Sequence, residues 1–105
     1  MSEFRITRGK GFQVTFDNGI TLSTQFGAGN YCENHSYDPQ ELKRPAKDIT
    51  CSNAEIAIWQ DFDKTWLTRQ AYKDLFNEDI EDDVKGWIDT SEWAKLIQWC
   101  ENYGK

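Results

Sequence analysis

Cysteines and long apolar runs are both scarce in this chain of 105 residues. Its three cysteines are odd in number and widely spaced, so they do not form the paired framework of a disulfide-stapled secreted domain. No segment approaches the roughly 20 consecutive apolar residues of a membrane span, and the mean hydropathy is −0.78. The first residues lack the apolar core of a signal peptide. We therefore expect reduced thiols, no membrane partner and a cytoplasmic location.

Basic residues are also in the minority. The 12 Lys and Arg residues against 18 Asp and Glu give a net charge of −6. This balance disfavours direct nucleic-acid binding, because that depends on a basic surface that displaces counterions. It permits a basic partner protein, and it permits a small anionic ligand held locally by backbone N–H groups and one or two cations.

Aromatic rings are plentiful. They make up 14% of the chain, and each can bury roughly 150–250 Å². A short chain with only 38% hydrophobic residues can therefore still bury a core. The length is that of one domain, which we expect to span residues 1–105.

Strand patterns dominate the first two thirds of the chain. Phe4–Thr7, Phe12–Phe16 and Ile20–Phe26 alternate apolar and polar residues with period two. Ala54–Trp59 is strongly apolar, as in a central strand, and Thr65–Thr68 is expected to pair beside it. Because the short links allow hairpins and not crossovers, the sheet should be mainly antiparallel, with about five strands.

The turn before Ile20 has a predictable type. A two-residue loop would place Phe16 opposite Thr21 and mix the two faces of the hairpin. A three-residue loop places Phe16 opposite Ile20 and Val14 opposite Leu22, which keeps the apolar face continuous. We therefore predict a type I turn followed by a bulge, with Gly19 in the left-handed region.

The C-terminal part has a helical period. Asp89 is placed as an N-cap with Glu92 three residues later, and an apolar stripe follows at helical spacing. That stripe comprises Trp93, Leu96, Ile97, Cys100 and Tyr103. From Gln70 to Val84 the apolar residues have irregular helical spacing. The predicted fold class is α+β, with the C-terminal helix packed on one face of the sheet.

The segment Gln25–Tyr37 is the best candidate for a binding site. Residues 27–53 show no clear periodicity, and loops carried on a rigid sheet often hold binding groups. Glycines would give backbone access, amides would give polar contacts, and a tyrosine would stack on a planar ring. The candidate ligand-binding residues are Gln25, Gly27, Gly29, Asn30, Tyr31, Asn34, His35 and Tyr37.

Two other constellations compete with that site. Cys32 and His35 could act as a nucleophile pair, or could bind zinc together with Cys51 and Cys100, although the spacing of the second pair is unusual. An acidic run could instead contact a basic partner protein. Its candidate residues are Glu78, Asp79, Glu81, Asp82 and Asp83.

Three stretches of the chain are similar to small uncharacterised proteins encoded by phages and prophages. They are Gly11–Gly19, Gln25–Cys32 and Ala54–Trp59. The resemblance implies a viral accessory role in the host cytoplasm, of the kind that binds and disables a host component. It supplies no catalytic residue.

We therefore predict a non-enzymatic binding protein with no catalytic residue, cofactor or metal. The preferred hypothesis is a counter-defence protein that sequesters a nucleotide-derived signal in the Gln25–Tyr37 loop. An acidic inhibitor of a host protein is the alternative, and a Cys/His-dependent enzyme or zinc protein is the second alternative. Sequestration often needs a pocket shared between copies, so a homodimer fits the preferred hypothesis.

Overall fold

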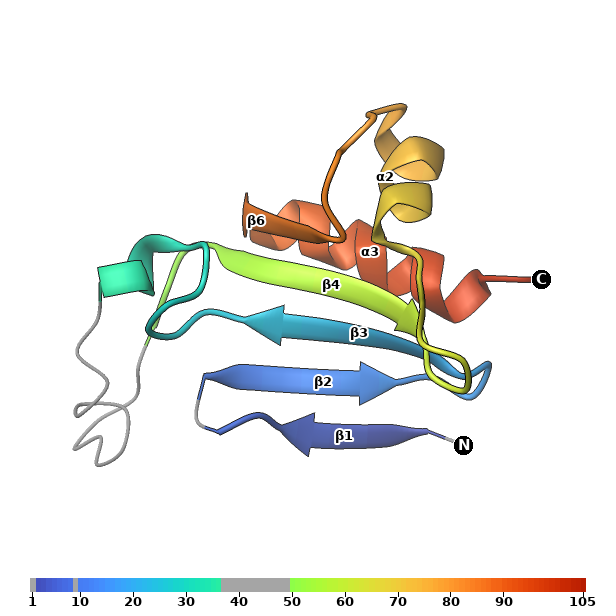
Figure 1. The fold of residues 1–105 in the computed structure, drawn as a ribbon, viewed down its shortest axis with the longest axis horizontal. Coiled ribbons are helices and arrows are strands. Elements are labelled where there is room, and N and C mark those ends of the chain that lie inside the picture. The colour runs from blue at the N-terminus through green and yellow to red at the C-terminus, as the bar shows by residue number, and fades with distance from the viewer. Residues whose placement is uncertain (1, 9, 37–49) are drawn as a thin grey trace.

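An antiparallel sheet forms the body of the protein in the computed structural model, which describes residues 2–8, 10–36 and 50–105. Within these residues the sheet has six strands, and β1 to β4 are neighbours in chain order (Figure 1). On the far side of β4, β6 pairs with its first half and β5 with its last residues. The strands are β1 (Glu3–Ile6), β2 (Gly11–Thr15), β3 (Ile20–Gln25), β4 (Ala54–Gln60), β5 (Thr65–Trp66) and β6 (Val84–Ile88).

The β2–β3 hairpin has the predicted register. Val14 lies opposite Leu22, and the Phe16 N–H donates to the Ile20 carbonyl at 2.9 Å. Gly19 has a φ of +84°, and its N–H donates to the Phe16 carbonyl. The three-residue turn with a left-handed glycine is therefore confirmed, and the apolar side chains of both strands share one face.

Two α-helices cover that apolar face over the β3–β4 part of the sheet (Figure 1). The predicted C-terminal helix is confirmed, and the Asp89 carboxylate accepts the Glu92 N–H at 2.8 Å as its cap. The helices are α2 (Thr68–Phe76) and α3 (Thr90–Asn102), and a short 3₁₀ helix, η1 (Glu33–Ser36), lies in the loop after β3. The core comprises Ile20, Leu22, Ile56, Ile58, Leu67, Ala71, Tyr72, Ile88, Leu96 and Cys100.

Two local predictions differ from the structure. Thr68 was expected in a strand but begins α2, where its hydroxyl donates to the Asp83 carbonyl and accepts the Ile58 N–H. Val84 was assigned to a helical pattern but begins β6. The ladder shifts within β6, because Ile88 pairs with Ala54 whereas Lys85 pairs with Ile56. This bulge interrupts the period-two alternation that would have identified the strand.

A glycine occupies position 86 in the bulge because Tyr31 lies directly against it. A Cβ on this residue would lie 2.4 Å from the Cβ of Tyr31, which is closer than two carbon atoms can approach. The next residue, Trp87, has a φ of +57° and donates its N–H to the Tyr31 carbonyl at 2.8 Å. The bulge therefore joins β6 to the loop that follows β3. Neither α-helix of the described ranges is both long enough and apolar enough to pass through a bilayer.

Replacing Gly19 tests the hairpin. We expect Gly19→Val to lower the free energy of unfolding by about 1–2 kcal/mol, because a β-branched residue resists the left-handed region. No atom lies within 4 Å of the Cβ position, so the loss is conformational and not steric. Gly19→Asn is the matched control and should lose less, since Asn tolerates this region. Urea unfolding measures both, and equal losses would contradict the assignment.

Candidate functional site

The predicted amide side chains are bonded within the protein. The Gln25 Nε2 donates to the Thr7 hydroxyl at 2.7 Å, which links the end of β3 to the end of β1. The Asn34 Nδ2 donates to the Phe26 carbonyl at 2.8 Å, and the Asn30 Oδ1 accepts the Gly27 N–H at 3.0 Å, so these two residues hold the loop after β3 together. Amides committed to such bonds would have to break them before they could contact a ligand. They therefore have less capacity for a ligand than the sequence indicated.

Glu55, which was not a candidate, anchors this loop to β4. One carboxylate oxygen accepts from the Asn30 Nδ2 at 3.2 Å, and the other accepts the Tyr31 N–H at 3.1 Å. The His35 Nδ1 lies 2.9 Å from the Asn30 carbonyl, so Nδ1 carries the proton in that bond. Hydrogen bonds to a carboxylate are stronger than neutral ones, so Glu55 is a strong polar support of the loop.

The aromatic rings of the predicted site are the side chains that remain exposed to solvent. Tyr31 is 53% exposed, and its ring lies nearly parallel to that of His35, with centroids 6.0 Å apart. Gly29 is exposed, whereas Gly27 is buried against Lys10. Tyr37 lies outside the described residues. The structure thus brings two rings of the predicted site together at the surface.

The predicted cysteine and histidine constellation is not assembled. Cys32 is fully buried after β3, and burial raises the pKa of its thiol to about 11, with the neighbouring Cys51 thiol adding to the rise. Cys100 lies in the core at the other end of β3, where Asn18 donates to its carbonyl, and burial raises its pKa to about 12. Within the described ranges, no three His, Cys, Asp or Glu side chains form a group able to hold a metal ion.

Basic side chains from nearby elements lie against the acidic run. Arg69 pairs with Asp83 at 3.4 Å, and Lys73 pairs with Asp79 at 3.3 Å. Glu78 lies 3.8 Å from the Lys85 ammonium. Three of the five candidate acidic residues thus have a cation of this chain beside them, which reduces the field that a basic partner would meet.

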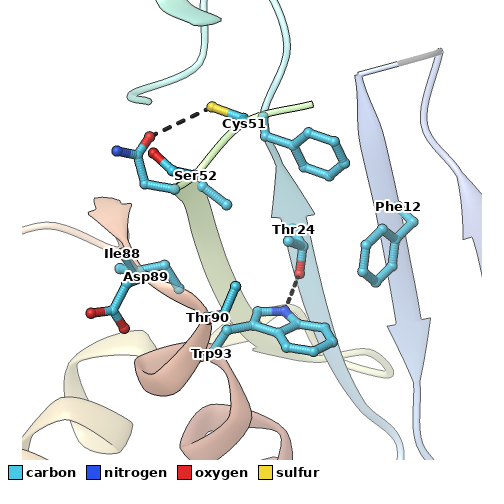
Figure 2. A pocket seen from close by; sticks show the side chains of 11 residues that line it. Phe12, Thr24, Cys51, Ser52, Ile88, Asp89, Thr90 and Trp93 are labelled. Carbon is cyan, nitrogen blue, oxygen red and sulfur yellow. Dashed lines mark hydrogen bonds between the residues drawn. The ribbon is translucent and has the colours of Figure 1, made fainter. Parts of the chain in front are cut away.

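The structure adds a pocket that the sequence did not reveal. It lies between β2, β3 and the first turn of α3, and its volume is about 180 Å³ (Figure 2). The sequence offers one signal for this pocket. Phe12 and Thr24 are expected opposite each other on one face of the hairpin, and the small Thr24 side chain leaves room beside the larger Phe12 ring. The lining residues are Phe12, Thr24, Phe26, Cys51, Ser52, Asn53, Ala54, Ile88, Asp89, Thr90 and Trp93.

Trp93 is held in a fixed orientation in this pocket. Its Nε1 donates to the Thr24 hydroxyl at 2.9 Å, and its ring meets Phe12 edge-to-face with centroids 6.1 Å apart. Figure 2 shows the indole and the Phe12 ring facing the space between them and the Cys51–Ser52 segment. The hydrogen bond uses the only donor of the indole, so the ring itself is what the pocket presents.

The charged group at the rim disfavours anions. Asp89 lies at the N-terminus of α3, and its carboxylate already accepts the Glu92 N–H. A helix N-terminus would otherwise attract an anion, but here that position holds a negative side chain. The opposite rim is tied to the loop after β3, because the Asn53 Oδ1 accepts the Glu33 N–H at 2.8 Å. The geometry therefore suits a neutral, planar, largely apolar group.

Comparison of the chain with protein families, with curated proteins and with solved structures finds no match. The resemblance to phage-encoded proteins stays a prediction.

Glu55→Ala tests the support of the loop. Alanine has no acceptor oxygen, so the Asn30 amide and the Tyr31 N–H both lose their partner, each at a cost of about 1–3 kcal/mol. We expect the Tyr31 amide to exchange its hydrogen about 5- to 150-fold faster, as measured by NMR. Glu101→Ala, on the exposed surface of α3, is the matched control and should change nothing at Tyr31. Unchanged exchange at Tyr31 would show that Glu55 is not the anchor.

Thiol labelling tests the buried cysteines. At pH 8 the pKa values of about 11 for Cys32 and about 12 for Cys100 keep both groups protonated and unreactive. Cys51 is only partly buried. We expect a maleimide to modify Cys51 first, and the other two only after denaturation, as followed by peptide mass spectrometry. Rapid labelling of Cys32 in the native protein would contradict this and revive the nucleophile hypothesis.

Proposed function

We propose that this chain is a non-catalytic binding protein that takes a small, planar, uncharged ring into the pocket beside Trp93. The observation that carries the proposal is the pocket wall. The aromatic rings of Phe12, Phe26 and Trp93 line one space, and the indole is held in place by Thr24. Nucleobases and related heteroaromatic rings have this shape and bind aromatic side chains by stacking.

The size of the pocket supports a ring of that kind. An engineered protein cavity of about 150 Å³ lined by apolar side chains binds benzene. At about 180 Å³ the pocket beside Trp93 is larger and is open to solvent. Stacking of a base on an aromatic side chain contributes about 1–3 kcal/mol to the free energy of binding. A ring held by three aromatic residues would therefore bind with an affinity that can be measured.

A polar group at the rim would orient the ring. Thr90 lies at the edge of the pocket, and its hydroxyl can donate or accept a hydrogen bond. The Asp89 carboxylate repels phosphate, so the charged part of a nucleotide would stay outside, away from α3. Phe26 belongs to the segment that the sequence singled out, and Glu33 of the same segment contacts Asn53. The predicted loop thus borders the proposed pocket.

Several observations support binding without conversion of the ligand. Among the described residues, the two buried thiols are protonated at neutral pH, because burial raises the pKa of each. The His35 Nδ1 is bonded to a backbone carbonyl. Sequestration of a nucleotide-derived signal is the role that fits such a protein, and this role and the phage setting stay predictions.

The alternative role as an acidic inhibitor of a host protein rests on fewer residues. Cations of the chain lie beside Glu78, Asp79 and Asp83, so the role falls mainly to Glu81 and Asp82, which are exposed between α2 and β6. If Glu81→Ser with Asp82→Ser abolished a specific protein complex, this alternative would replace ring binding.

A pair of neighbouring substitutions tests the pocket. Thr90 lines it and is exposed, so Thr90→Phe should fill the mouth without disturbing the core. Ser91 is exposed one residue later and does not line the pocket, so Ser91→Phe is the matched control. We expect nucleosides at millimolar concentration to raise the melting temperature of the wild type and of Ser91→Phe, and Thr90→Phe to bind at least about tenfold more weakly.

The negative charge of Asp89 at the rim allows a second test of the pocket. Asn is as good an N-cap as Asp, so Asp89→Asn keeps α3 capped while removing the negative charge. The wild type should prefer a nucleoside to the matching nucleotide, and Asp89→Asn should reduce that preference, as measured by calorimetry. No binding of any nucleoside, cyclic nucleotide or ADP-ribose at millimolar concentration, or equal binding by Thr90→Phe, would overturn the proposal.

A further inference from the structure

β1 is an outer strand of the sheet, and its apolar side chains are exposed. Phe4 is 87% and Ile6 is 82% exposed, although their register through Val14 and Leu22 places them on the face that the helices cover elsewhere. In Figure 1 the helices lie over the β3–β4 side of the sheet, and β1 forms its outer edge. Bulky apolar side chains on an outer strand are unusual, because such an edge can pair with another chain.

Among residues 2–8, 10–36 and 50–105, no strand pairs with the outer edge of β1, which leaves a defined set of its backbone groups open. The Thr7 N–H donates to the Gly11 carbonyl, so Thr7 and Gly11 are a hydrogen-bonded pair. Bonded and non-bonded pairs alternate along an antiparallel ladder, so Glu3 and Arg5 direct their backbone groups toward β2. The N–H and C=O groups of Phe4 and Ile6 therefore point away from the sheet.

We propose that β1 is the interface of a symmetric homodimer, in which β1 of a second copy pairs antiparallel with it and extends the sheet across both copies. The two-fold axis passes between Phe4 and Phe4 of the second copy, which exchange their backbone hydrogen bonds. Ile6 then pairs with Ser2 of the second copy. This register uses the outward-pointing backbone groups of β1 and places the two Phe4 rings side by side on the apolar face.

Charge complementarity selects this register over its neighbours. With Phe4 opposite Phe4 of the second copy, Glu3 faces Arg5 of the second copy, and Arg5 faces Glu3 of the second copy, on the polar face. A shift of two residues would place the two Arg5 side chains opposite each other, and a shift of one would mix the polar and apolar faces. Within one copy Glu3 and Arg5 form only an exposed pair at 3.3 Å, so both can re-pair across the interface.

Charge reversal tests the dimer and its register together. Glu3→Arg places like charges at both cross-strand contacts, and Arg5→Glu does the same with the opposite sign. We expect each single variant to weaken dimerisation at least about tenfold by sedimentation equilibrium. Glu3→Arg with Arg5→Glu in one chain should restore it. An equimolar mixture of the two single variants should form a heterodimer, a result that folding stability alone cannot produce.

Hydrogen exchange gives an independent measurement on the wild type. The amides of Phe4 and Ile6 should become protected as protein concentration rises from micromolar to millimolar. The Arg5 amide, whose bonding is directed to β2, should be protected at every concentration. A monomer throughout this range, or a dimer whose strength is unchanged by either single charge reversal, would overturn the proposal.

Discussion

Helix α3 packs its buried residues Leu96 and Cys100 against the sheet, and two side-chain hydrogen bonds, one near each of its ends, fix its direction there. At its N-terminal end the Trp93 indole donates to Thr24 of β3. At its C-terminal end Asn18, in the turn before β3, donates to the Cys100 carbonyl at 2.7 Å. Each bond contributes about 0.5–1.5 kcal/mol, and together they align the helix with β3. The pocket lies beside the N-terminal end of the helix. β1 lies outside the part of the sheet that the helices cover.

The parts of the fold that follow local rules could be predicted from the sequence. The Gly19 turn follows from the requirement that Val14 and Leu22 share a face, and the start of α3 follows from the Asp89 cap. β6 could not be found in this way, because its bulge at Gly86 exists to make room for Tyr31, which is 55 positions earlier in the sequence. The local pattern of apolar and polar residues does not indicate such a long-range contact.

The candidate site divides in the same way. The loop after β3 and its polar residues could be located from the sequence. That Glu55 and a neighbouring carbonyl would occupy the amides of Asn30 and Asn34 could not. A side chain shows what it can bond to, whereas its actual partner depends on the tertiary fold. The pocket was missed for a related reason. Phe12, Ala54 and Trp93 come from distant parts of the chain and meet only once the helix lies on the sheet.

The bond between Asn18 and the end of α3 also bears on how the molecule reaches its folded state. Its two partners are 82 residues apart in sequence, whereas the hairpin on which Asn18 lies closes within a few residues. The hairpin can therefore form early, but the docking that covers its apolar face must wait for a long-range encounter. Until then Ile20 and Leu22 remain exposed to water, and apolar strands exposed in this way favour aggregation.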